Sequence, residues 1–150
     1  MTRIRFLPLI LLMACLVLTG CPASTPSTST PAAPTPVQIT VANAVNALVQ
    51  GVNGVVDSAI AARDAGKMDP SDVAAVESFC KVALTTAKQV DADLRTTDPW
   101  ATQRSKILTD VSQAGLGTLK AHISPSAQLL VSSLVVLVNQ ISTNVGGPTI

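Results

Sequence analysis

The chain has 150 residues, of which 47% are hydrophobic, 13% are charged and only 2% are aromatic, and its formal net charge is +1. This balance provides neither the strongly basic surface that nucleic acids require nor a polybasic patch for anionic lipids. The sequence has one histidine and 3 cysteines, and Cys80 is the one cysteine that follows the first 21 residues; one His with one Cys cannot complete a closed zinc site in that part of the chain.

The first 20 residues have the three parts of a secretory signal. Arg3 and Arg5 form a positively charged start, residues 7–18 are apolar apart from Pro8, and small residues follow. The apolar run spans about 12 residues, whereas a transmembrane helix needs roughly 20. Residues 1–20 are therefore predicted to be an export signal that is removed.

The signal ends on four residues that define its type: Leu18, Thr19, Gly20 and Cys21. This motif resembles the lipobox of bacterial lipoproteins. The resemblance implies that Cys21 is diacylated on sulfur, that the chain is cut before it, and that membrane lipid holds the protein through it. Two or more acyl chains anchor a protein stably, whereas one does so marginally. In enterobacterial members an Asp after the cysteine favours the inner membrane. Pro22 stands here, which favours the outer membrane.

Cleavage before Cys21 changes the charge balance and the cysteine count. Removing 20 residues leaves 130, and the loss of Arg3 and Arg5 leaves 8 basic and 9 acidic side chains. Cys15 leaves with the signal and Cys21 carries lipid, so Cys80 is the remaining thiol and no intrachain disulfide is expected.

Residues 21–35 are predicted to form a flexible linker after the anchor, because they are rich in Pro, Ser and Thr and carry no charge. Proline-rich segments favour extended polyproline II at about 3.1 Å per residue, so the linker would hold a domain up to about 40 Å from the bilayer.

Four dipeptides place a helix-capping residue directly before proline: Thr35-Pro36, Asp69-Pro70, Asp98-Pro99 and Ser124-Pro125. Proline suits the first position of a helix, where its missing N–H would have had no partner. The four pairs predict four helices. Gln38 after Thr35 and Asp72 after Asp69 predict capping boxes. Gly66 and Gly146 are expected to end the first and last helices, which gives a helical domain at 36–146 and a tail at 147–150.

Apolar residues recur at helical spacing in each interval. The expected buried stripe of the first helix is Val41, Val45, Leu48, Val52, Val55 and Ala59, and that of the second is Val73, Val76, Cys80, Ala83, Ala87, Val90 and Leu94. The third has Ile107, Leu108, Val111, Leu119 and Ile123, but Gly115 and Gly117 predict a bend. The stripe of the fourth is Ala127, Leu130, Leu134, Leu137 and Ile141, within a segment that is apolar nearly all round.

Short turns between long helices predict an all-α fold, an antiparallel four-helix bundle. The alternative is two helical hairpins that close a core only by dimerising.

All charged side chains of the cleaved chain lie between Asp57 and Lys120, so the fourth helix has none. A surface helix ordinarily has a charged face. The fourth helix is therefore expected to be central in the bundle, covered by a partner, or laid on lipid.

No catalytic, cofactor-binding or metal-binding residue is predicted. His122 is expected near the end of the third helix, and Cys80 on the buried stripe of the second. Asp91 and Asp93 point to different sides of a helix, so they form no carboxylate pair. Two acid-first pairs, Glu77 with Lys81 and Asp91 with Arg95, suit exposed salt bridges along the second helix.

The sequence favours a non-enzymatic envelope lipoprotein that acts as a binding or structural module. Its expected partners are an envelope protein or a second copy, and not a nucleic acid. One alternative is a carrier of an apolar ligand in the bundle core. Another is a small phage lipoprotein of the spanin or superinfection-exclusion type, which Cys21 and its proline tract resemble.

Overall fold

The computed structural model describes residues 33–150, and over this range it contains five α-helices and no strand. The helices are α1 (Pro36–Asp64), α2 (Pro70–Leu94), α3 (Trp100–Gln113), α4 (Leu116–His122) and α5 (Pro125–Asn144). The signal segment 1–20, the motif at 18–21 and most of the linker 21–35 lie outside the described residues. The all-α fold class is confirmed.

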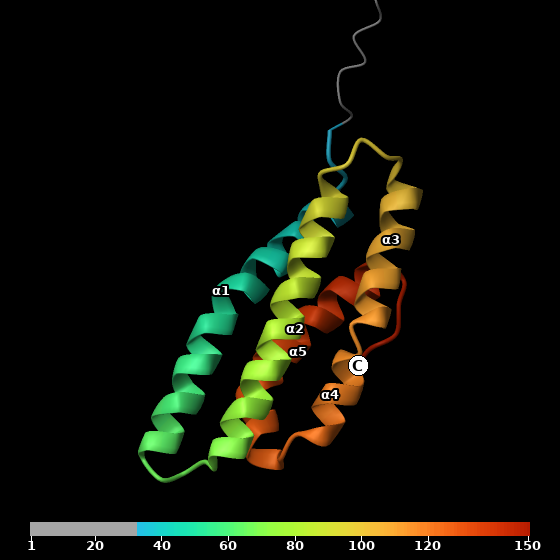
Figure 1. Cartoon of the computed structure of the whole chain (residues 1–150). Coiled ribbons are helices and arrows are strands. Elements are labelled where there is room, and N and C mark those ends of the chain that lie inside the picture. The colour runs from blue at the N-terminus through green and yellow to red at the C-terminus, as the bar shows by residue number, and fades with distance from the viewer. Residues whose placement is uncertain (1–32) are drawn as a thin grey trace, which may run out of the picture. The chain divides into compact units, whose positions relative to one another are not determined.

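The helices form an antiparallel bundle in which α3 and α4 together fill the third position (Figure 1). Both run in the same direction, one after the other, and α5 returns behind α2. The buried hydrophobic cluster takes residues from all five helices. The core thus closes within one chain, as expected for the bundle rather than for the two hairpins.

The predicted starts of α1 and α5 are confirmed in atomic detail. Thr35 Oγ1 accepts from Gln38 N at 3.3 Å, and Gln38 Oε1 accepts from Thr35 N at 2.7 Å, which completes a capping box. At α5, Ser124 Oγ accepts from Ala127 N at 3.3 Å. Each bond satisfies an amide that would otherwise lack a partner inside the helix.

The other two predicted caps differ from expectation. Asp69 occupies the N-cap of α2, but its side chain caps nothing, and the capping box with Asp72 does not form. The N-cap of α3 is Pro99 rather than Asp98. The Asp98 carboxylate instead accepts from Lys106 Nζ at 2.6 Å. The ion pair with Lys106 draws that carboxylate away from the free amides of the helix start.

Both predicted glycine stops are confirmed as left-handed C-caps. Gly66 has φ 67° and Gly146 has φ 81°. After α1, Gly66 N donates to Arg63 O at 2.8 Å and Lys67 N donates to Ala62 O at 2.8 Å. Gly146 and Gly147 repeat this pair of bonds after α5, which is the Schellman arrangement. Residues 147–150 then fold back on the bundle, where Ile150 N donates to Asn139 Oδ1 at 2.8 Å.

The bend expected in the third helix is a complete break at Gly115. This residue has φ 65°, a conformation that costs little for glycine and more for residues with a Cβ. Helix α3 ends at Gln113, and α4 restarts at Leu116, whose side chain is 1% exposed. The break turns Leu116 into the core that Ile107 and Val111 already fill.

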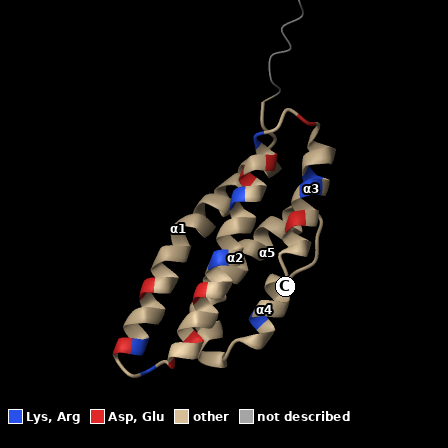
Figure 2. Ribbon diagram, in the orientation of Figure 1, with Lys and Arg blue, Asp and Glu red and all other residues tan. Residues whose placement is uncertain are grey.

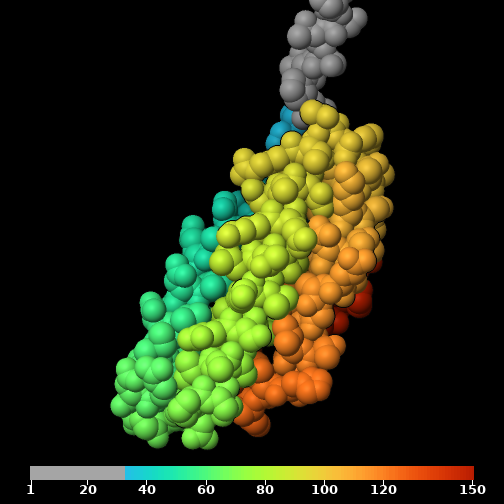
Figure 3. Space-filling view, in the orientation of Figure 1, coloured from blue at the N-terminus to red at the C-terminus, as the bar shows by residue number. Residues whose placement is uncertain are grey.

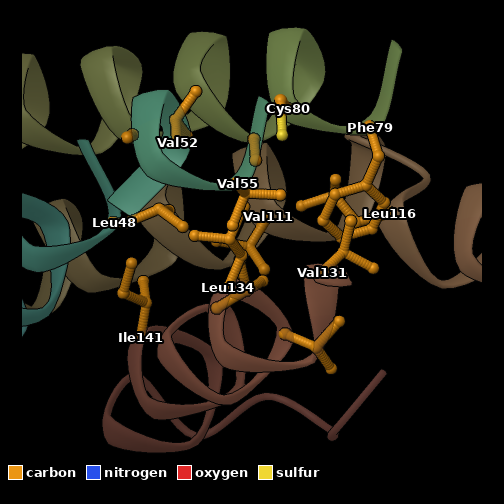
Figure 4. Packing of buried hydrophobic residues seen from close by; sticks show 14 of the residues in the cluster. Leu48, Val52, Val55, Phe79, Cys80, Val111, Leu116, Val131, Leu134 and Ile141 are labelled. Atoms are coloured by element: carbon orange, nitrogen blue, oxygen red, sulfur yellow. The ribbon is translucent and has the colours of Figure 1, made fainter. Parts of the chain in front are cut away.

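The predicted stripes of the first two helices are buried, apart from half-buried Leu94. Phe79 was not among them, yet it is 0% exposed and packs with the core at α2, near Leu116 and Val131 (Figure 4). In α5, Leu130 and Leu137 are only half-buried, and the positions that are buried instead are Val131, Val135 and Val138.

Helix α2 packs on all four other helices and lies at the centre of the bundle. Figure 3 shows α2 in the middle of the viewed face, between α1 and the α3–α4 pair. Fully buried Ala83 and Ala87 leave room on α2 for its neighbours. Helix α5, the fourth helix expected from the sequence, packs mainly on α1 and α2. Its inner side is buried in the bundle, but its outer side is not, so it is not the central helix.

Candidate functional site

The predicted lipidation site Cys21 and the signal-peptidase motif before it, Leu18, Thr19 and Gly20, lie outside the described residues. The candidate site of the described domain is therefore a surface. It was indicated in the sequence only by the missing charges of the fourth helix.

The outward side of α5 forms one stripe of uncharged residues, which we call the α5 outer face: Leu129, Ser132, Ser133, Val136 and Gln140. Apart from the adjacent Ser132 and Ser133, these residues are spaced three or four apart, so they share one side of the helix. Leu129 is 77% exposed and Val136 is 59% exposed, the largest exposed fractions among the large hydrophobic side chains of the described range. In Figure 2 the acidic and basic residues lie on the second half of α1, on α2, α3 and α4, and on the turns that join α1 to α2 and α2 to α3.

A hollow of about 450 Å³ adjoins the α5 outer face where α4 meets α5. It is lined by Lys120, Pro125, Gln128, Leu129, Ser132 and Val135. Gln128 Nε2 donates to Lys120 O at 3.2 Å and to Ile123 O at 3.0 Å, and these bonds fix the turn between the two helices. Lys120 Nζ donates to Ile150 O at 3.3 Å, so the single charged group of the lining is bonded to the folded-back tail.

The opposite side of α5 is held in place by close contact with α1. A Cβ added at Gly51 would lie 3.0 Å from Leu134 Cδ2, so the absence of a side chain there lets the two helices approach closely. Helices α1 and α5 are both long and apolar enough to cross a membrane, a test that the core helices of compact domains also pass. Each of them buries one side in the core, so the exposed stripe of α5 is set by packing.

A second hollow, of about 390 Å³, lies between α2 and α3 and is lined by Asp93, Ser105, Lys106, Thr109 and Asp110. It contains a carboxyl pair that the sequence did not predict, because Asp93 meets Asp110 on another helix rather than Asp91 on its own. Burial raises the pKa of Asp110 above its ordinary 3.8, and a hydrogen bond and charge repulsion with Asp93 raise it further. Asp93 Oδ2 is buried and has no hydrogen-bond partner. A proton shared by the two carboxyl groups would provide the missing hydrogen bond.

Replacing Asp93 with asparagine is expected to stabilise the domain at pH 7 by about 1 kcal/mol, since an amide donor would satisfy Asp110. The raised pKa of Asp110 means that the folded state holds its proton more tightly than the unfolded chain. The stability that protonated Asp110 contributes is therefore complete below about pH 4, and it is lost as the pH rises through the pKa of Asp110 in the folded state. Urea unfolding from pH 4 to 8 should show this loss in the wild type and a flatter profile in Asp93→Asn.

The control for this measurement is Asp91→Asn. Asp91 bonds Arg95 on the surface, at 2.8 Å and 3.0 Å, as its spacing predicted. Removal of such an exposed pair should change stability by less than about 1 kcal/mol and leave the pH profile unchanged. If the pH dependence of stability in Asp93→Asn equals that of the wild type, the assignment of Asp93 and Asp110 as a coupled carboxyl pair is contradicted.

Glu77 and Lys81, the other predicted pair, form no salt bridge although both are described.

Cys80 lies in the core as predicted, with 2% of its surface exposed. Burial, and to a smaller extent the carboxylate of Glu77, raises the pKa of this thiol to about 11. The Cys80 thiol is protonated at neutral pH and is a poor nucleophile and a poor metal ligand.

His122 lies in the last turn of α4, where its ring Nδ1 is 2.7 Å from Thr118 O. Within residues 33–150, no three His, Cys, Asp or Glu residues are grouped to hold a metal.

Cys80 in the folded domain is expected to resist maleimide at pH 7 and to react fully in denaturant, because the thiol is both buried and protonated. Intact-mass spectrometry after timed labelling checks this result. A Cys80→Ser variant should fold with a modest loss of stability, since the side chain has nearly the same size. Rapid labelling of the native wild type would contradict the core assignment.

Comparison of the chain with models of known families, with curated proteins and with solved structures finds no match.

Proposed function

We propose that this protein is a lipid-anchored module of the bacterial cell envelope, without catalytic activity, that binds a partner protein through the α5 outer face. The Leu18-Thr19-Gly20-Cys21 motif supports the anchor, and Pro22 after it favours the outer membrane. The linker then places the helical domain within about 40 Å of the bilayer.

The observation that carries the binding role is the exposure of Leu129 and Val136 on a helix without charge. Uncharged, partly apolar surfaces lose little hydration energy on contact and are typical of the centre of protein interfaces. The charged residues of the domain lie elsewhere, on the second half of α1, on α2, α3 and α4, and on the turns that join α1 to α2 and α2 to α3.

Site-specific photocrosslinking in the membrane-anchored protein tests this role. A photoreactive amino acid at Val136 is expected to give a discrete crosslinked protein band, identified by mass spectrometry. The control position is Lys88, which is exposed on α2 within the charged part of the domain. Equal crosslinking at the two positions, or none at Val136, would contradict a binding role for the α5 outer face.

A further inference from the structure

We propose that the partner of the α5 outer face is the same face of a second copy of this chain, in a two-fold symmetric dimer. Leu129 of each copy enters the α4–α5 hollow of the other. This inference rests on the binding role proposed above and identifies the partner.

The first argument is the shape of the face. Leu129 is 77% exposed, so its side chain projects from the surface, and the hollow of about 450 Å³ lies directly beside it. A projection and a recess next to each other on one surface are self-complementary. When two copies meet across a two-fold axis, each leucine faces the recess of the other copy, and the contact closes after one pair.

The second argument is the chemistry of the recess. Pro125 and Val135 provide apolar lining, and Nε2 of Gln128 donates to Lys120 O and Ile123 O. Ser132 Oγ donates to Leu129 O at 2.7 Å, so its hydroxyl proton is also satisfied. An incoming leucine would therefore leave these donors bonded, and would bury apolar surface at about 25 cal/mol per Å².

The third argument is the charge of the face. A strongly acidic or basic partner would find no opposite charge on α5, and an anionic bilayer would find neither a basic cluster nor an aromatic residue there. A second copy presents an equally uncharged stripe, and the charged group that lines its hollow is Lys120. Lys120 Nζ, the nearest charge, is bonded to Ile150 O.

The acyl anchor explains why a narrow stripe is sufficient. One helix face buries less area than the standard interface of about 800 Å² per partner, so the contact alone is weak. Two anchored copies share one membrane, and this confinement raises their effective concentration. The dimer is therefore a property of the membrane-bound protein.

Disulfide trapping in the full-length anchored protein tests the dimer. Ser132 lies between Leu129 and Val136 on the stripe, close to the proposed two-fold axis, so Ser132→Cys should form an intermolecular disulfide under mild oxidation. A band of twice the monomer mass is expected on non-reducing gels, at least tenfold stronger than for Thr85→Cys. Thr85 is the control because it is exposed on α2, away from α5.

A second substitution separates loss of contact from loss of folding. Leu129→Asp in the Ser132→Cys background should reduce the trapped dimer at least tenfold with an unchanged melting temperature, because the position is exposed. Absence of the dimer in Ser132→Cys, or its persistence with Leu129→Asp, would overturn the proposed dimer. If Val136 crosslinks only to a protein of different mass, the second copy is excluded while the binding role stands.

Discussion

Replacing Phe79 with alanine is expected to lower the free energy of unfolding by about 3–5 kcal/mol. Phe79 is 0% exposed and is among the largest fully buried side chains of the domain. Figure 4 places it at the α2 end of the cluster, with Leu116 and Val131 close by. Truncation removes the apolar contacts of the ring and leaves a cavity that these helices cannot fully close.

Urea unfolding followed by circular dichroism measures this loss. The matched control is Ser78→Ala, one residue earlier on α2 and exposed, which should change stability by no more than about 0.5 kcal/mol. A loss below about 1 kcal/mol for Phe79→Ala would mean that the ring is not packed as the structure has it.

Replacing Cys21 with serine is expected to abolish lipidation. The diacylglycerol would be attached through the sulfur of Cys21, and a serine hydroxyl does not replace it in that bond. Cells fed an alkyne fatty acid should label the wild type and not the variant. The variant should remain an unprocessed precursor or be found unanchored after fractionation.

Cys80→Ser is the control for this experiment, because Cys80 is the other thiol of the cleaved chain and is buried with a pKa of about 11. It should be labelled as strongly as the wild type. Globomycin-sensitive processing that continues unchanged in Cys21→Ser would contradict the lipobox interpretation, and with it the envelope location.

Proline and glycine made the helices predictable from the sequence. Proline at the first position of α1, α2 and α5 and left-handed glycine after α1 and α5 act locally, through the backbone of one turn. The break at Gly115 was expected as a bend, because Gly115 and Gly117 have low helix propensity. Apolar spacing then placed the buried side of α1 and α2, because in both helices a polar side gives the pattern a clear phase.

Contacts between residues far apart in the chain were not predictable in this way. Asp93 and Asp110 are 17 positions apart and meet only because α3 packs on α2. Asp98 does not cap α3 as expected, because Lys106 on α3 lies within reach of the Asp98 carboxylate and donates to it. Phe79 is buried because α4 restarts at Leu116 and brings a further apolar side chain to α2.

The sequence by itself determined the all-α fold class, the ends of α1 and α5 and the uncharged character of α5, since each depends on local backbone preference or on composition. Only the tertiary structure decided which side of α5 faces water. Apolar residues occur on nearly every side of α5, so their spacing does not identify the side that is buried. The orientation of the helix is set by the residues that pack against it. The contact of Leu134 with Gly51 on α1, together with the bonds of Gln128 at the α4–α5 turn, leaves Leu129 and Val136 outside.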